Sequence, residues 1–379
     1  MSATSIEELH DDCLYYVFQF LPTEDRINFA QVCKRFRQFF INQCGGKYRE
    51  FTLDKDSTRM ELIQFCTCRE VVTSLTIDLD HFNTARCFRN YGCVAPENCF
   101  AILCQTLAGM IGLEHLVVNQ LFFLITPVVK PFDQILAAVG HLPKLTRLEI
   151  HARDDCSLDQ LSQLRHLENL QLLVPKIPLA TLVKSCKSNG NLSSLHLGYA
   201  CVQKNLRDIV PYCKNIEVFK FGMSANSSEY LPLAMLPKLR ELSYCGVRRS
   251  GSFEPLLSAL AAKSQLTHLS IDGGSLTLQE ASQLVRIQSL RQCKCFCSST
   301  ECVEMLSLLA NLEELCLSMS CPLDISNALL AIIANCTNLK LLRIARGNVS
   351  TNVLEDAIRL KNTKAKKNTQ NAIVLEVDK

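Results

Sequence analysis

Residues 312–317 read Leu-Glu-Glu-Leu-Cys-Leu, and residues 192–197 read Leu-Ser-Ser-Leu-His-Leu. In both stretches an apolar residue is followed by two others, three and five positions later. Nine copies of this spacing begin 22 to 27 residues apart, so one structural unit repeats along most of the chain. The nine apolar triplets are Leu145/Leu148/Ile150, Leu167/Leu170/Leu172, Leu192/Leu195/Leu197, Ile216/Phe219/Phe221, Leu239/Leu242/Tyr244, Leu266/Leu269/Ile271, Leu290/Cys293/Cys295, Leu312/Leu315/Leu317 and Leu339/Leu342/Ile344.

Less regular copies extend the series at both ends and bring the predicted strands to as many as thirteen. They are Tyr48/Phe51/Leu53, Val72/Leu75/Ile77, Leu113/Leu116/Val118 and Ala372/Leu375/Val377. A period of roughly 20 to 29 residues with this consensus resembles the leucine-rich repeat. The resemblance implies an α/β horseshoe solenoid, with a parallel strand ladder on the concave face and helices on the convex face. Such solenoids bind other proteins.

Each unit is predicted to hold one strand and one helical segment. In the unit 312–338, the consensus leucines mark a strand whose alternate side chains turn inward. Ser326 is expected to cap a helix in which Ala328, Leu329 and Ile332 recur at helical spacing. Further helices are predicted at 178–186, 255–263, 277–285, 299–309 and 351–360. Strand residues between the consensus positions should then point into the concave groove.

Composition and charge exclude several classes of function. The 379 residues are 48% hydrophobic and 20% charged, which provides ample core and argues against bulk disorder. A net charge of +3 is too small to indicate binding to nucleic acid or to a membrane surface. The apolar runs are too short for a transmembrane helix, and the N-terminus is acidic where a signal peptide is basic. We therefore expect a cytoplasmic and/or nuclear protein that binds neither nucleic acid nor membrane.

The chain contains 21 cysteines, which we expect to be reduced thiols because no secretory signal is present. Cys293 and Cys295 occupy consensus strand positions and should both face the core, since residues two apart in a strand point the same way. A metal site is the alternative, with the cluster between Cys87 and Cys104 as one candidate. No pair has the Cys-x-x-Cys spacing of a zinc site, so neither a metal nor a cofactor is expected.

Residues 6–41 do not follow the repeat and are predicted to form three helices. One helical stripe starts near Asp11 or Asp12 and consists of Leu14, Val17, Phe18 and Leu21. Pro22 ends this helix, and Thr23 is expected to cap a second one. A third runs through 34–41. From periodicity alone, these helices can be a cap that shields the first repeat, as solenoids require.

The residue pattern of this segment resembles the F-box. Residues 9–21 read Leu-His-Asp-Asp-Cys-Leu-Tyr-Tyr-Val-Phe-Gln-Phe-Leu, and residues 32–36 read Val-Cys-Lys-Arg-Phe. The family pattern has proline where His10 stands, leucine at Arg26 and tryptophan at Phe36. A cysteine before the strand and a unit of roughly 26 residues resemble the cysteine-containing repeats of F-box proteins. We expect an F-box-like helical domain at 1–46 and a leucine-rich-repeat domain at 47–379.

The resemblance implies a substrate-recognition subunit of an SCF-type ubiquitin ligase. In such ligases the F-box binds a Skp-type adaptor, and through it a cullin, while the repeats hold a protein substrate for ubiquitination and proteasomal degradation. The receptor itself is not an enzyme and contributes proximity. Residues that match the adaptor-facing pattern, some of which must instead hold the helices together, are Leu9, Leu14, Val17, Phe18, Leu21, Val32, Cys33 and Phe36.

Candidate contacts with the substrate are strand residues predicted to point into the groove. They are Arg147, Glu149, His196, Lys220, His268, Lys294, Phe296 and Arg343. The alternative for each is a solvated face of mixed charge. Phe296 is the favoured contact because aromatic side chains are enriched at interface hot spots. The mixed signs argue against a groove for nucleic acid, and the basic run at 361–367 is expected to be a surface segment.

Two other classes of function remain open. A pure interaction scaffold would keep the repeats and bind no adaptor. An enzyme would need a catalytic constellation, and the chain has no Gly-rich phosphate loop, no Gly-x-Ser-x-Gly and no His-Glu-x-x-His.

Overall fold

The computed structural model describes residues 6–54, 56–82, 96–120, 130–199, 201–202, 206–222, 227–246, 251–321, 323–345 and 373–378. By its internal contacts the chain divides into two compact units, Met1–Leu170 and Gln171–Lys379. Some of the features predicted from the sequence lie outside the described residues, namely the helix at 351–360, the basic run at 361–367, Cys87 and Cys93.

The first unit begins with the three predicted helices. These are α1 (Asp11–Phe20), α2 (Thr23–Val32) and α3 (Lys34–Cys44). The expectation that Thr23 caps α2 is wrong. Thr23 is already helical, and the extended residue before it is Pro22, which has no side-chain acceptor. Cys33 does cap the next helix, because its Sγ accepts a hydrogen bond from the backbone N–H of Phe36 at 3.4 Å.

The rest of the first unit alternates strands and helices. The strands are β1 (Glu50–Leu53), β2 (Ser74–Asp78), β3 (His115–Gln120) and β4 (Arg147–Ala152), and β5 (Asn169–Leu173) lies at the unit boundary. The helices are α4 (Arg59–Cys68), α5 (Leu79–Phe82), α7 (Pro96–Ala108) and α8 (Pro131–Val139). The strands β1 to β4 pair in parallel, with Leu75 opposite Leu116 and Leu116 opposite Leu148. The consensus leucines therefore stack on one another across the sheet.

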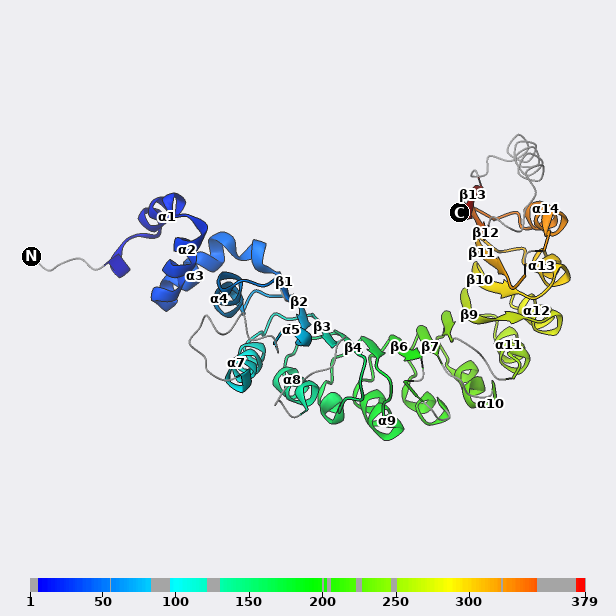
Figure 1. Ribbon diagram of the computed structural model, residues 1–379, viewed down its shortest axis with the longest axis horizontal. Helices are drawn as coiled ribbons and strands as arrows, with labels where there is room; N and C mark the ends of the chain where they lie inside the picture. The colour runs from blue at the N-terminus through cyan, green and yellow to red at the C-terminus, as the bar shows by residue number, and fades with distance from the viewer. Residues whose placement is uncertain are drawn as a thin grey trace, which may run out of the picture. The chain divides into compact units, whose positions relative to one another are not determined.

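The second unit continues the same pattern. Its strands are β6 (Ser194–Tyr199), β7 (Val218–Gly222), β8 (Glu241–Cys245), β9 (His268–Leu276), β10 (Gln292–Cys297), β11 (Glu314–Met319), β12 (Leu341–Ala345) and β13 (Val374–Asp378). Its helices are α9 (Leu179–Ser188), α10 (Ser227–Tyr230), α11 (Glu254–Ala261), α12 (Leu278–Leu284), α13 (Thr300–Leu306) and α14 (Ser326–Asn335). Neighbouring strands from β6 to β13 pair in parallel. Figure 1 shows the helices α11 to α14 on one side of the strands β9 to β12.

Burial along the strands confirms the predicted register. In β11, Leu315 and Leu317 are buried, whereas their neighbours Glu314, Cys316 and Ser318 are partly exposed. In each of the thirteen predicted triplets the second and third residues fall within a strand of the described part of the chain. The interior lies between the strands and the helices, where each leucine removed from water stabilises the fold by roughly 1.5–3 kcal/mol. The predicted α/β solenoid of repeated strand and helix is confirmed.

The predicted helices at 178–186, 255–263, 277–285 and 299–309 coincide with α9, α11, α12 and α13. Thr277 forms a capping box with Glu280, which satisfies two of the orphan N–H groups at the start of α12. The buried Glu280 carboxylate also accepts from the backbone N–H of Phe253 at 2.7 Å, which joins the starts of two successive helices. The expectation for Ser326 is wrong, since it is the first helical residue of α14 and the N-cap is Ile325.

The cysteines of β10 lie in the interior, as predicted for Cys293 and Cys295. Their sulfur atoms are 4.0 Å apart, and Cys297 is buried beside them. The hydrogen bond with Cys293, together with burial, raises the pKa of the Cys295 thiol well above its usual value. The Cys295 thiol therefore stays neutral and packs as a small apolar group. Within the described ranges, no group of three or more His, Cys, Asp or Glu side chains is placed to hold a metal ion.

Candidate functional site

The eight residues predicted to face an adaptor differ in burial. Three that are buried in the core of the N-terminal helices are Leu14, Phe18 and Phe36. Three that are partly buried against that core are Leu9, Leu21 and Cys33. The remaining two, Val17 and Val32, are 43% and 63% exposed. The exposed pair can contact a partner while the helices stay packed, whereas the buried three hold the helices together.

Sequence reasoning missed three exposed aromatic residues on α1. Tyr15, Tyr16 and Phe20 are 42%, 68% and 84% exposed. Tyr16 and Phe20 are four residues apart and so lie on the same side of the helix. The sequence did indicate that some of these residues are exposed, because five of the six residues from 15 to 20 are large and apolar or aromatic. One turn of helix has about 3.6 residues, so they surround α1 and cannot all face one core.

The three departures from the F-box pattern each have a structural role. His10 is the N-cap of α1, where its Nδ1 accepts from the backbone N–H of Asp12 at 3.4 Å. Arg26 donates to the carbonyl oxygens of Phe18 and Gln19 at 3.2 and 3.1 Å, at the end of α1 where orphan carbonyls favour a cation. Phe36 stacks on Phe29 with ring centroids 4.2 Å apart.

The core of the N-terminal helices continues into the first repeat. Phe40 of α3 stacks on Tyr48 at 5.6 Å, and Tyr48 on Phe51 of β1 at 6.1 Å. Phe51 then meets Phe65 of α4 edge-on at 5.8 Å. Burial raises the pKa of the Tyr48 hydroxyl, which agrees with its place inside this column. The helices and the first repeats therefore form one packed body.

The residues predicted to contact substrate all lie on the side of the strands that faces away from the helices, here called the open face. In the first unit these are Arg147 and Glu149 on β4. The Glu149 carboxylate lies between two histidines, with one oxygen 3.2 Å from His115 Nε2 and the other 3.6 Å from His151 Nε2. In the second unit they are His196, Lys220, His268, Lys294, Phe296 and Arg343.

On the open face of the second unit, side chains from successive strands form two rows. The strand register aligns the first row, which consists of Glu241, His268, Gln292 and Glu314. It also aligns the second row, which consists of Lys220, Ser243, Ser270, Lys294, Cys316 and Arg343. In the second row the long basic side chains are therefore separated by small ones, two serines between Lys220 and Lys294 and Cys316 between Lys294 and Arg343.

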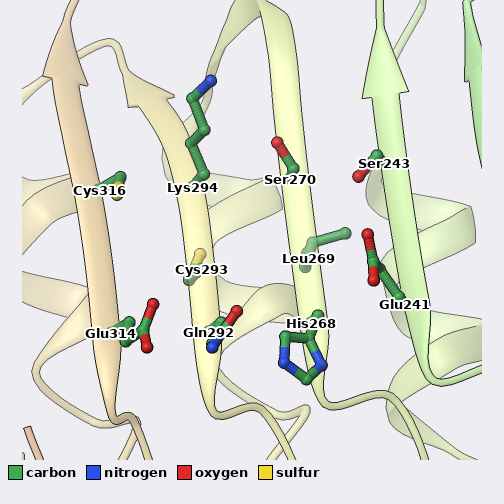
Figure 2. A pocket seen from close by; sticks show the side chains of 10 residues that line it. All are labelled: Glu241, Ser243, His268, Leu269, Ser270, Gln292, Cys293, Lys294, Glu314 and Cys316. Atoms are coloured by element: carbon green, nitrogen blue, oxygen red, sulfur yellow. The ribbon is translucent and has the colours of Figure 1, made fainter. Parts of the chain in front are cut away.

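These small side chains leave a hollow of 240 Å³ over β8 to β11. It extends over both rows, with Leu269 and Cys293 from the strand interior at its floor. Figure 2 shows the carboxylates of Glu241 and Glu314 near the beginning of the strands and the Lys294 side chain running towards their carboxyl ends. Phe296, two residues beyond Lys294, does not line the hollow.

The basic residues of the second row are paired with carboxylates. Lys220 Nζ lies 3.0 Å from Glu241, and Lys294 Nζ lies 3.0 Å from Asp272. Arg343 Nε donates to Glu376 at 2.7 Å. By contrast, the side chains of Gln292 and Glu314 form no hydrogen bond or ion pair with any described residue. The hollow thus offers a carboxylate and an amide that are not engaged by the described part of the chain.

Comparison with known proteins supports both parts of the architecture. Residues 6–47 match the F-box domain. The fold is similar to the crystal structure of an internalin (inlF) from Listeria monocytogenes str. 4b F2365, with a TM-score of 0.53 and 14% sequence identity over 97% of this chain and 94% of that chain. At that identity the likeness shows the fold alone, which is a leucine-rich-repeat fold. A comparison with curated proteins found no match.

The chain therefore combines an F-box domain with a leucine-rich-repeat fold. That the repeats belong to the cysteine-containing class stays a prediction, as does the domain boundary at 46/47. Among the described residues, none of the helices is both long and apolar enough to cross a bilayer.

Proposed function

We propose that this protein is a substrate-recognition subunit of an SCF-type ubiquitin ligase. The F-box domain binds a Skp-type adaptor and through it a cullin. The open face of the repeats binds a protein substrate for ubiquitination and proteasomal degradation. The chain performs no chemistry in this role, because holding the substrate near the charged conjugating enzyme is enough to raise the rate of transfer.

The observation that carries the proposal is the exposed apolar surface of the F-box domain. Tyr16, Val17 and Phe20 on α1 and Val32 at the end of α2 leave large apolar groups in water. Apolar groups gathered on so small a domain are typical of a protein-binding site. An adaptor that covers them gains burial without unfolding the domain. A cap that only shields the first repeat gives no reason for apolar residues on its outer side.

The packed column from Phe40 to Phe65 supports the second part of the proposal. A receptor must hold its substrate at a set distance from the enzyme, and a flexible link would lose that advantage. Because the F-box core continues into the first repeat, the adaptor and the first repeats keep a fixed relation.

Co-purification with a Skp-type adaptor tests the proposal. The variant Phe20→Ala/Val32→Ala removes two exposed groups and should keep the fold, while adaptor binding should weaken by roughly tenfold or more. The matched control is Met235→Ala/Leu308→Ala, which removes exposed apolar groups from the second unit and should bind normally. If the wild-type protein captures no adaptor, the scaffold reading replaces this proposal.

A further inference from the structure

We propose that the hollow over β8 to β11 binds an extended segment of the substrate that carries an arginine or lysine side chain, with Glu314 as its counter-charge. The inference rests on the proposed receptor function and specifies the chemistry that the receptor recognises.

The charge around the hollow favours a cation. Glu314 is half-buried, and its carboxylate has no partner among the described residues. The amide of Gln292, next to it in the first row, also lacks a partner there. A guanidinium or ammonium group can donate to both acceptors, and charge-assisted bonds of this kind are the stronger ones.

An anionic ligand fits the same hollow poorly. The Lys294 ammonium already lies 3.0 Å from Asp272 and, as Figure 2 shows, extends away from the first row. Lys220, outside the lining, is 3.0 Å from Glu241. An acidic group would have to break one of these pairs and would face the two first-row carboxylates.

The second row also offers a hydrogen-bonding group to a segment that crosses β8. Ser243 lines the hollow, so its hydroxyl is within reach of a ligand bound there. A serine hydroxyl both donates and accepts hydrogen bonds, so a backbone carbonyl or N–H of the segment can bond to it.

The dimensions of the hollow suit an extended segment. Neighbouring strands are about 4.8 Å apart, so the distance from Ser243 on β8 to Glu314 on β11 is roughly 14 Å. An extended chain advances about 3.3 Å per residue, so about four residues span it. The small side chains of Ser243 and Ser270 allow the backbone of the segment to approach, while its basic side chain reaches Glu314.

The test uses the full chain and a library of eight-residue peptides in which each position in turn is fixed as Arg, Lys, Glu or Leu. Binding is measured by fluorescence polarisation. We expect pools with a fixed Arg or Lys to bind more tightly than pools with Glu or Leu. Glu314→Gln keeps the shape of the side chain and should reduce the preference for basic pools about tenfold. Ser270→Arg, which places a cation in the hollow, should also abolish the preference.

The control is Glu304→Gln on the exposed side of α13, which should leave binding unchanged. The melting temperatures of all three variants are measured as well. Values within error of wild type show that a change in peptide binding comes from the hollow and not from loss of the fold. Equal or tighter binding of the Glu pools, the absence of binding by any pool, or a Glu314→Gln variant that behaves like Glu304→Gln would each overturn the inference.

The two proposals fail in different ways. If the adaptor co-purifies but basic peptides show no preference, only the assignment of the hollow is wrong. If no adaptor binds, the receptor function is wrong whatever the peptides do.

Discussion

Cys68 lies at the end of α4, in the core shared by the F-box domain and the first repeat. Burial, with a smaller effect from Cys44, raises the pKa of its thiol from the usual 9.0 to about 12. Below pH 9 the thiol is protonated in both the folded and the unfolded chain, so its contribution to stability is constant. Between pH 9 and about 12 the unfolded chain releases this proton and the folded chain does not. Rising pH therefore favours the unfolded state.

We expect the free energy of unfolding to fall above pH 9, with Cys68 contributing about 1.4 kcal/mol per pH unit. Urea unfolding at pH 8, 9 and 10 with a reductant present measures this fall. Cys68→Ala should show a shallower decline than wild type. Cys321→Ala, which removes an exposed thiol, should keep the wild-type slope. Parallel curves for all three proteins would show that Cys68 is not held neutral.

At the scale of the element, each strand turns one set of side chains to the interior and the other to the open face. Side chains of β11 alternate between the interior and the open face, and the parallel register carries this alternation across the neighbouring strands. Leu315 is fully buried opposite Cys293 and Leu342, whereas its neighbour Cys316 lines the hollow. Two adjacent residues thus have different roles, because a strand turns successive side chains to opposite faces.

Leu315→Ala should lower the free energy of unfolding of the second unit by about 2–5 kcal/mol, because it leaves a cavity between strand and helix. Cys316→Ala should change it by less than about 0.5 kcal/mol. Thermal unfolding followed by circular dichroism compares the two variants. A large effect at Cys316 and a small one at Leu315 would mean that β11 is shifted by one residue.

At the scale of the whole molecule, the F-box domain is part of the folded body of the first unit. Tyr48, Phe51, Met60, Ile63 and Val71 pack against its core from the repeat side. A solenoid needs its terminal repeat covered, because an open end leaves the apolar interior in water. The same helices thus cover the first repeat and leave Phe20 exposed.

Deletion of residues 1–47 should therefore lower the melting temperature and increase binding of a dye that reports exposed apolar surface, because the column that ends at Phe65 loses its cover. Differential scanning calorimetry and dye fluorescence measure both effects. Phe20→Ala in the full-length chain is the control and should change neither, since Phe20 is 84% exposed. A shortened chain that melts like the full-length protein would indicate an independent F-box domain.

The sequence by itself determined the repeat, the strand positions and the side of each strand that is buried. This was possible because alternation along a strand is a local property: Leu315 and Leu317 face inward in any parallel ladder built from these residues. The inward orientation of Cys293 and Cys295 followed in the same way. The helix starts at Thr23 and Ser326 were misplaced by one residue, because the N-caps are Pro22 and Ile325, whose side chains cannot accept a hydrogen bond and so carry no capping signal.

Only the tertiary structure decided which apolar residues of the F-box domain face outward. Apolar groups surround α1, so its sequence has no single polar side. The packing of α2 and α3 buries Leu14 and Phe18 and leaves Phe20 in water. The hollow likewise depends on four strands. Its lining extends from Glu241 on the first of them to Glu314 on the last, which is more than seventy residues later in the chain. Such a site forms only when the strands are aligned in the sheet. The alignment depends on strand register and side-chain packing, and neither can be read from one segment of the sequence.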